Sequence, residues 1–440
     1  MALMDATTLA SGHARRSQCS LAAQLSRRFF IALLFVMPSG LPLSLFGVPA
    51  YQSDQIQIVI IAPLVGVRAL QLLQRRWLDR WESTIMVFLL YCYFVSFISN
   101  SFFIPQPPDG WLPGLVLLVP LLLLFALDAF KITVKEVIDG LLIAALFAAM
   151  LVNVDRVSPI AGLDSYLHTA IHDPSLRRIV VMHNEMGFAF VILVARLLNM
   201  RTLGGALLYL AALALLSGPL FVVSETRLVI AAAVIGCMLY ALLVYRSTVK
   251  ALVLSVLAVI AAGLSPLIFG KYIDYAMAMG DLGDDPSVRF RAIEILHFGQ
   301  LFDQTAGFGF GLMSLSPNKP NILTDALFRD AALYGAPDYW LSLVDIRIYG
   351  ALYQFGYVGF VLVLGLTLIV AYRLWWCSRE VAYTRRDDVG AVAATVVAFM
   401  LSPLPMNLFT AENTVTIGGM LWFLTARASR EVRALRQAPP

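Results

Sequence analysis

Charged residues are scarce in this sequence, and their scarcity excludes an ordinary soluble enzyme. They make up 14% of the 440 residues, whereas hydrophobic residues make up 60%; soluble domains carry about 25% charged residues. The mean hydropathy is correspondingly high, at +0.79. Apolar runs of about 17 to 25 residues recur along the chain, and each is long enough to cross a bilayer as a helix. The composition therefore predicts a polytopic membrane protein.

Cysteine and histidine are also rare, and the common spacings for disulfide frameworks and metal sites are missing. The four cysteines form no C-x-x-C pair, and the five histidines include no H-E-x-x-H sequence. Such spacings are the usual sequence signals for zinc sites and redox pairs. The sequence therefore predicts no metal and no cofactor.

The apolar segments predict an all-α membrane protein with about 12 transmembrane helices. We expect a cytoplasmic tail (1–28), nine spans within 29–270, a large loop (271–348), three spans within 349–427 and a basic tail (428–440). The predicted spans run approximately over 29–50, 55–73, 83–104, 111–130, 136–154, 181–200, 203–223, 227–245, 249–270, 349–372, 389–409 and 412–427.

Lysine and arginine indicate which side of the membrane each loop faces. With the N-terminus inside, 21 of the 32 basic residues lie in cytoplasmic loops or at cytoplasmic helix ends. Cytoplasmic loops are normally enriched in these residues. We therefore expect both termini in the cytoplasm and the loop 271–348 outside. Arg68, Asp128 and Asp139 fall near cytoplasmic helix ends, where we expect their side chains to snorkel to the interface.

Ten basic residues remain on the outer side, concentrated in the loops 155–180 and 271–348. Arg177 and Arg178 belong to the first of these loops. Positive charge outside opposes the usual bias, although long loops can cross the membrane regardless of their charge. The alternative to that explanation is an anionic ligand held at the outer membrane surface.

The first candidate anion site is Ser224-Glu225-Thr226-Arg227, where the eighth predicted span starts. Ser224 is a suitable N-cap, so the helix would present free backbone N–H groups and the positive end of its dipole. Arg227 adds a planar guanidinium that suits phosphate oxygens. The segment predicts an anion site at headgroup level, with a snorkelling Arg227 paired to Glu225 as the alternative.

The second candidate lies in the large loop, at residues 287–291, which read Ser-Val-Arg-Phe-Arg. Ser287 can cap a helix over 288–303, on which Arg291 heads an apolar stripe and Arg289 lies off it. Arg291 is therefore the better candidate for a buried role. The apolar members of the stripe are Ile295, Phe298 and Phe302.

Glycine recurs just downstream, where residues 307–311 read Gly-Phe-Gly-Phe-Gly. Glycine tolerates backbone angles that other residues avoid, and it leaves room for a close neighbour. The segment can therefore make tight turns or approach a ligand closely, but such a pattern alone is weak evidence for a site.

The third candidate is Asp345-Ile346-Arg347, directly before the tenth predicted span. A carboxylate there could act as a general base or orient a hydroxyl group, and a local Asp345–Arg347 surface pair is the alternative. His183-Asn184-Glu185 (residues 183–185) marks the outer end of the sixth span. Polar groups in a span usually face the bundle interior or a cavity, although hydrogen bonding between helices would explain them equally well.

In order and sidedness, these motifs resemble the O-antigen ligase and polymerase superfamily. The resemblance rests on S-x-T-R at a span start, then R-x-R and G-x-G-x-G in a long outer loop, then an acidic residue before G-x-x-G at Gly356 and Gly359. The resemblance covers roughly residues 177–365. The superfamily includes Wzy-type polysaccharide polymerases and lipopolysaccharide O-antigen ligases. Members are described as GT-C-type glycosyltransferases that use undecaprenyl-diphosphate-linked sugars at the periplasmic face.

The resemblance implies roles for individual residues. Arg227 and Arg291 would hold the donor diphosphate without a metal, and Asp345 would be catalytic. Asp345 stands where ligases usually have a histidine, which favours a polymerase, and the aromatic residue common after the loop arginine is missing, since Ile295 or His297 stands there. We expect further substrate contacts from Arg177, Arg178, His183, Ser224, Thr226, Arg289 and Arg347.

The resemblance thus implies an exopolysaccharide or O-antigen polymerase, of the xanthan kind, in the bacterial inner membrane. Its partners would be undecaprenyl-diphosphate-linked oligosaccharide, membrane lipids, a chain-length regulator and export proteins, with no nucleic acid. The alternatives are an O-antigen ligase, a flippase for lipid-linked oligosaccharides, and a non-enzymatic scaffold. A flippase would need charges along a central cavity, whereas a scaffold would need neither Arg227 nor Arg291.

Overall fold

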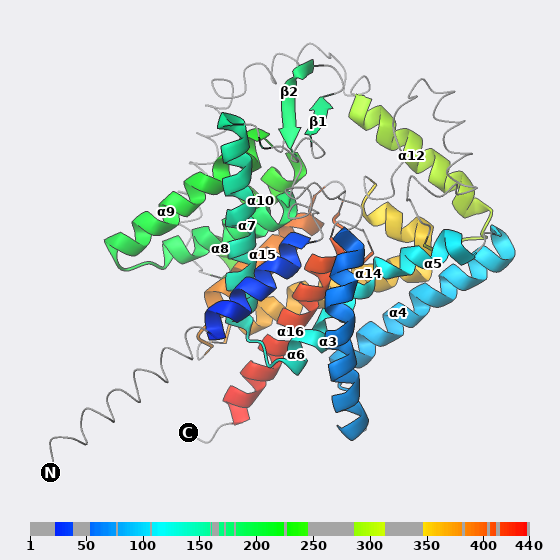
Figure 1. The fold of residues 1–440 in the computed structure, drawn as a ribbon, viewed down its shortest axis with the longest axis horizontal. Coiled ribbons are helices and arrows are strands. Elements are labelled where there is room, and N and C mark those ends of the chain that lie inside the picture. The colour runs from blue at the N-terminus through cyan, green and yellow to red at the C-terminus, as the bar shows by residue number, and fades with distance from the viewer. Residues whose placement is uncertain are drawn as a thin grey trace.

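The described part of the chain is helical apart from one short β-hairpin, as a computed structural model shows (Figure 1). Among the described residues, four helices are long and apolar enough to cross a membrane: Arg80–Phe103, Val134–Asp155, Leu203–Leu220 and Ile348–Ser378. These apolar helices agree with a helical membrane protein. The structure describes residues 23–37, 53–75, 78–105, 108–158, 160, 167–170, 173–179, 182–223, 227–244, 286–312, 346–380, 383–402, 405–410 and 414–437.

Most of the predicted spans overlap helices of the structure. Each predicted span overlaps a helix except 249–270, which lies outside the described residues. Before the hairpin come a helix over 23–36, α3 (Ser53–Arg75), α4 (Arg80–Ile98), η3 (Ser99–Phe103), α5 (Pro108–Val116), η4 (Val119–Leu122), α6 (Leu123–Ala129) and α7 (Val134–Val157). After it come α8 (His183–Leu198), α9 (Leu203–Ser217), η6 (Gly218–Val223), α10 (Arg227–Leu239), η7 (Tyr240–Val244), α12 (Pro286–Asp303), α14 (Ile348–Ser378), α15 (Arg386–Met400) and α16 (Val415–Gln437).

The predicted span over 111–130 is not one regular α-helix. The structure divides this segment among α5, η4 and α6. Pro120 lies at the start of η4, and proline both lacks the amide hydrogen of a helical bond and crowds the preceding turn. The chain therefore cannot continue α5 as a regular α-helix through this point.

The hairpin lies in the predicted outer loop 155–180, where we expected no strands. Strand β1 (Leu167–Ala170) pairs antiparallel with β2 (Asp173–Ile179), and Thr169 and His168 lie opposite Arg177 and Arg178. Strand β2 contacts η6, directly before the segment that leads into α10.

Ion pairs join helix termini at one end of the bundle. Arg196, in the last turn of α8, lies 3.0 Å from Asp139 near the start of α7 and 2.8 Å from Asp388 near the start of α15. Arg430, near the end of α16, lies 2.5 Å from Asp128 near the end of α6. These pairs join termini that an alternating chain would bring to the same side.

The expectation that Arg68, Asp128 and Asp139 snorkel is wrong, because each pairs within the protein. Arg68 lies 2.7 Å from Glu82, and their side chains are 11% and 1% exposed. Asp139 also lies 3.3 Å from Arg28, in addition to its contact with Arg196. An oppositely charged partner on a neighbouring helix offsets part of the cost of burying each charge, so the side chain need not reach water.

The turn between α14 and α15 belongs to this same end. The Tyr383 hydroxyl donates a hydrogen bond to Glu431 of α16 at 3.0 Å, and Arg436 lies 2.6 Å from Glu380. Burial raises the pKa of the Tyr383 hydroxyl above its usual value, and the negative charge of Glu431 raises that pKa further. Tyr383 therefore stays protonated as a hydrogen-bond donor at neutral pH.

Candidate functional site

Helix α14 is broken near its N-terminal end. Gly356 has φ 71° and ψ −174°, which interrupts the helical backbone eight residues after Ile348. In an apolar bundle the backbone groups freed by such a break need new partners, because an unpaired buried polar group is costly. The hydrogen-bond partners of these backbone groups show which segment packs against the break.

The glycine-rich segment 307–311 supplies most of those partners. The backbone N–H of Phe310 donates to the carbonyl of Tyr353 at 3.0 Å, and that of Gly311 to the carbonyl of Gln354 at 2.6 Å. The N–H of Tyr357 donates back to the carbonyl of Gly307 at 3.4 Å. The segment and the broken helix therefore satisfy each other's backbone.

The close approach explains two of the glycines. A Cβ on Gly309 would lie 2.4 Å from the backbone nitrogen of Gly356, and a Cβ on Gly356 would lie 2.4 Å from the carbonyl oxygen of Phe308. Both residues also have positive φ angles, of 94° and 71°. The sequence predicted that segment 307–311 makes tight turns or approaches a ligand closely, and the structure shows Gly309 close to the backbone of Gly356.

Helix α4 holds the glycine-rich segment from its other side. The Ser96 hydroxyl accepts a hydrogen bond from the N–H of Leu312 at 3.0 Å, and the Ser99 hydroxyl donates to the carbonyl of Gly309. Tyr91 donates to the carbonyl of Phe355 in the break at 2.7 Å. Sequence analysis missed these residues, although small polar side chains near the end of an apolar span were a usable signal.

Helix α12 docks on the same part of α14 through its predicted apolar stripe. Phe298 and Phe302 are buried, Ile295 packs beside them, and the cluster includes Tyr353 of α14. The stripe prediction is therefore confirmed for these three residues of α12. The other members of the cluster are Ile104, Leu301, Phe310 and Ile346, with Leu352 packed against it.

Docking brings Ile346 of the third candidate motif into the same cluster as the α12 stripe. Ile346 is fully buried beside the α12 stripe, and Arg347 follows it as the residue before α14. Arg347 is half-buried and has a φ angle of 52°, an unusual backbone conformation for a non-glycine residue. Strained residues of this kind concentrate at functional sites. Asp345 itself lies outside the described residues.

The loop arginines are placed by their backbone alone. Arg289 and Arg291 both belong to the first turns of α12, and Arg291 precedes Ile295 by about one turn. The structure describes neither of their side chains. Glu294, which sequence analysis missed, lies between Arg291 and Ile295 and is fully buried. Its spacing of three residues from Arg291 was the signal that could have drawn attention to it.

Three of the remaining candidates lie on elements that contact η6, and Arg227 follows η6 in the chain. Arg227 is the first residue of α10, and Arg177 and Arg178 lie on β2, which contacts η6. The side chains of these arginines are not among those that the structure describes. His183 begins α8, which also contacts η6. Ser224 and Thr226 lie outside the described residues.

Asn184 and Glu185 confirm that the polar group at the start of α8 faces the interior. Their side chains are buried, with 4% and 7% exposure, whereas His183 is half-buried. The Asn184 Oδ1 atom has no hydrogen-bond partner among the residues that the structure describes. A buried acceptor without a partner is costly, which marks this helix start as a further candidate contact for a hydroxyl donor.

The candidates near the start of α14 and those near the starts of α8 and α10 lie at the helix ends opposite the ion pairs. The termini that carry ion pairs are the end of α8 and the start of α15, whereas the candidates lie at the starts of α8, α10 and α14. Figure 1 shows the hairpin and α12 at the top of the view, and the C-terminal end of α16 at the bottom. The candidate site therefore belongs to one end of the bundle.

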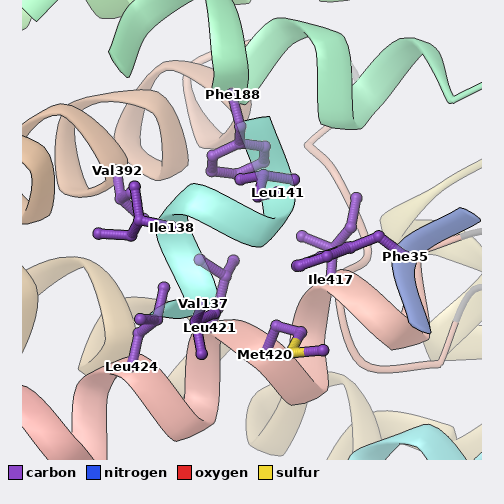
Figure 2. A pocket seen from close by; sticks show the side chains of 10 residues that line it. All are labelled: Phe35, Val137, Ile138, Leu141, Phe188, Val392, Ile417, Met420, Leu421 and Leu424. Atoms are coloured by element: carbon purple, nitrogen blue, oxygen red, sulfur yellow. The ribbon is translucent and has the colours of Figure 1, made fainter. Parts of the chain in front are cut away.

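A small apolar pocket deeper in the bundle does not fit the predicted anion site. It lies among the helix over 23–36, α7, α8, α15 and α16, and Figure 2 shows ten apolar side chains around it. Such a lining offers no charge or hydrogen bond to a phosphate or sugar. Its lining residues are Phe35, Val137, Ile138, Leu141, Phe188, Val392, Ile417, Met420, Leu421 and Leu424.

No family model and no curated protein matches this chain. The residues and contacts above therefore carry the functional argument.

Proposed function

We propose that the chain is a metal-independent glycosyltransferase that joins undecaprenyl-diphosphate-linked oligosaccharide units into a polysaccharide at the outer face of the bacterial inner membrane. The observation that carries this proposal is the docking of α12 onto the broken part of α14. The backbone of Arg291 lies one turn before the stripe that packs on Ile346, the neighbour of Arg347. In this proposal a phosphate-binding arginine and the segment around Asp345 act close to each other.

In this proposal the chain has about twelve spans in a GT-C-like arrangement, with the loop 271–348 in the periplasm. The ion pairs support the alternating topology, because Arg196 and Arg430 join only termini that the positive-inside distribution assigns to the cytoplasm. The proposal assigns the arginines predicted at the other end to an anionic substrate.

The proposed reaction uses undecaprenyl diphosphate as the leaving group. A sugar hydroxyl of one unit attacks the anomeric carbon of another, the new glycosidic C–O bond forms, and the C–O bond to the diphosphate breaks. Asp345 accepts the hydroxyl proton. Arg227 and Arg291, together with the N–H groups at the start of α10, stabilise the negative charge that develops on the diphosphate. The lipid tails would enter between helices.

The distribution of charge favours this reaction over transport across the bilayer. A flippase for a diphosphate-linked sugar needs polar groups along a central path, because a charged headgroup inside an apolar bundle is costly. One pocket within the described part of the bundle is lined by apolar side chains alone (Figure 2). The candidate arginines belong instead to elements at one end.

Cells that lack the protein should accumulate single lipid-linked units on the outer face of the inner membrane. A glycosidase added to intact spheroplasts would then digest those units, whereas a flippase defect would leave them facing the cytoplasm and protected. Units that become accessible only after the spheroplasts are broken would contradict the proposed polymerase.

The orientation has its own test, a Lys319→Cys variant in which the four native cysteines have been replaced. Because position 319 lies in the predicted periplasmic loop, a membrane-impermeant thiol reagent should label it in intact spheroplasts. Lys131→Cys, at an exposed position on the predicted cytoplasmic side, is the matched control and should stay unlabelled. Labelling of position 319 only after inner-membrane permeabilisation would reverse the orientation.

A further inference from the structure

We propose that the break in α14 is a seat for α12, and that Tyr353 and Gly309 are positioning residues that act through this seat on Arg291. We call the backbone of 353–357 together with 307–311 the seat. The part of the proposal that concerns Arg291 rests on the proposed function, whereas the seat itself does not.

Tyr353 connects the two halves of the arrangement. Its hydroxyl donates to the carbonyl of Ile295 on α12 at 3.2 Å, and its own carbonyl accepts from Phe310 at 3.0 Å. Its ring lies 6.5 Å from that of Phe298 and 5.7 Å from that of Phe302, measured between centroids. The Tyr353 side chain therefore contacts α12, while the Tyr353 backbone is part of the broken region of α14.

The anchored point on α12 lies close to the arginine. Ile295 follows Arg291 by four residues, which is about one helical turn. A rigid helix transmits a shift at Ile295 to Arg291 with little loss over that distance. A diphosphate contact of the bidentate kind depends on the position and angle of the guanidinium, so displacement of α12 would weaken it.

The seat leaves little freedom to the glycine-rich segment. Gly309 approaches the nitrogen of Gly356 so closely that a Cβ would lie 2.4 Å from it and 2.5 Å from the carbonyl oxygen of Gln354. Both obstacles are backbone atoms, which cannot move aside as a flexible side chain can. Hydroxyls of Ser96 and Ser99 hold the segment against α4. Alanine at position 309 should therefore push the segment, and α12 with it, off α14.

The first measurement is amide hydrogen–deuterium exchange in full-length protein, on peptides that cover 286–303. Gly309→Ala should speed exchange in these peptides about 10- to 100-fold, because overpacking against backbone destabilises the docked state. Gly365→Ala is the matched control, since it lies on α14 with no atom within 4 Å of the added Cβ. Its exchange in 286–303 should equal that of the wild type.

Tyr353→Phe is the second variant, in case Gly309→Ala does not fold. It removes the hydroxyl bond to Ile295 and keeps the ring, so exchange in 286–303 should rise about 5-fold. Unchanged exchange in both Gly309→Ala and Tyr353→Phe would overturn the seat. This result does not depend on whether the protein makes polymer.

The second measurement is a double-mutant cycle on polymer formation, with Arg291→Lys as the partner variant. If the seat acts through Arg291, Tyr353→Phe should slow the wild type but add little to the defect of Arg291→Lys. Fully multiplicative defects would overturn the positioning role while leaving the seat in place. A wild type that forms no polymer would refute the proposed function, and the exchange data would still decide the seat.

Discussion

Asp345→Asn should lower the rate of polymer formation about 10²- to 10⁴-fold, the usual cost of losing a general base. Asparagine keeps the shape of the side chain but cannot accept the proton of the attacking hydroxyl. The rate should be measured with purified protein and lipid-linked repeat units, and the bound donor should be measured separately. We expect donor binding to change little, because the carboxylate acts on the acceptor.

Asp303→Asn is the matched control for Asp345→Asn. Asp303 ends α12 and its side chain is exposed, so neutralising it should leave the rate near that of the wild type. Full activity of Asp345→Asn would remove this carboxylate from the mechanism. An equal loss in both variants would indicate a general effect of charge in the outer loop instead.

Arg291→Lys and Arg227→Lys should each lower the rate about 10- to 100-fold while the protein still inserts into the membrane. Lysine keeps the charge but cannot make two parallel bonds to a phosphate, and a hydrogen bond to a charged group contributes about 1.5–3 kcal/mol. Because about 1.4 kcal/mol corresponds to a factor of ten in rate, one lost bond accounts for this range. Initial rates at saturating acceptor and varied donor would show the effect.

Arg289→Lys provides the comparison on the same helix. Arg289 lies off the stripe that docks α12 on α14, so its replacement should have a milder effect. Near-normal polymer from Arg291→Lys would exclude this residue from the diphosphate site. Equal defects in Arg289→Lys and Arg291→Lys would show that the stripe does not select the functional arginine.

The docked face of α12 could be predicted from sequence because it depends on local periodicity. Ile295, Phe298 and Phe302 repeat at helical spacing, and any helix over these residues places them on one side. The partner of that face could not be predicted, since no local pattern relates α12 to Tyr353. The break at Gly356 was hidden for the same reason, because a glycine within an apolar run is compatible with a continuous helix.

The ion pairs illustrate a similar limit. Sequence alone placed Asp128 and Asp139 near helix ends, and the structure confirms that Asp128 lies near the end of α6 and Asp139 near the start of α7. Their pairing with Arg430 and Arg196 depends on packing between helices, and Arg430 and Asp128 are 302 residues apart in the chain. The positions of these charged residues could therefore be predicted from sequence, whereas their ion-pair partners could not.

The most direct measurement incubates the purified protein in liposomes with undecaprenyl-diphosphate-linked repeat units and separates the products by size. The account predicts a ladder of polymers that grows with time, released undecaprenyl diphosphate in proportion to the bonds formed, and little polymer with Arg291→Lys. Units that cross the liposome membrane without being joined, or that remain single while the folded protein binds them, would contradict the proposed polymerase.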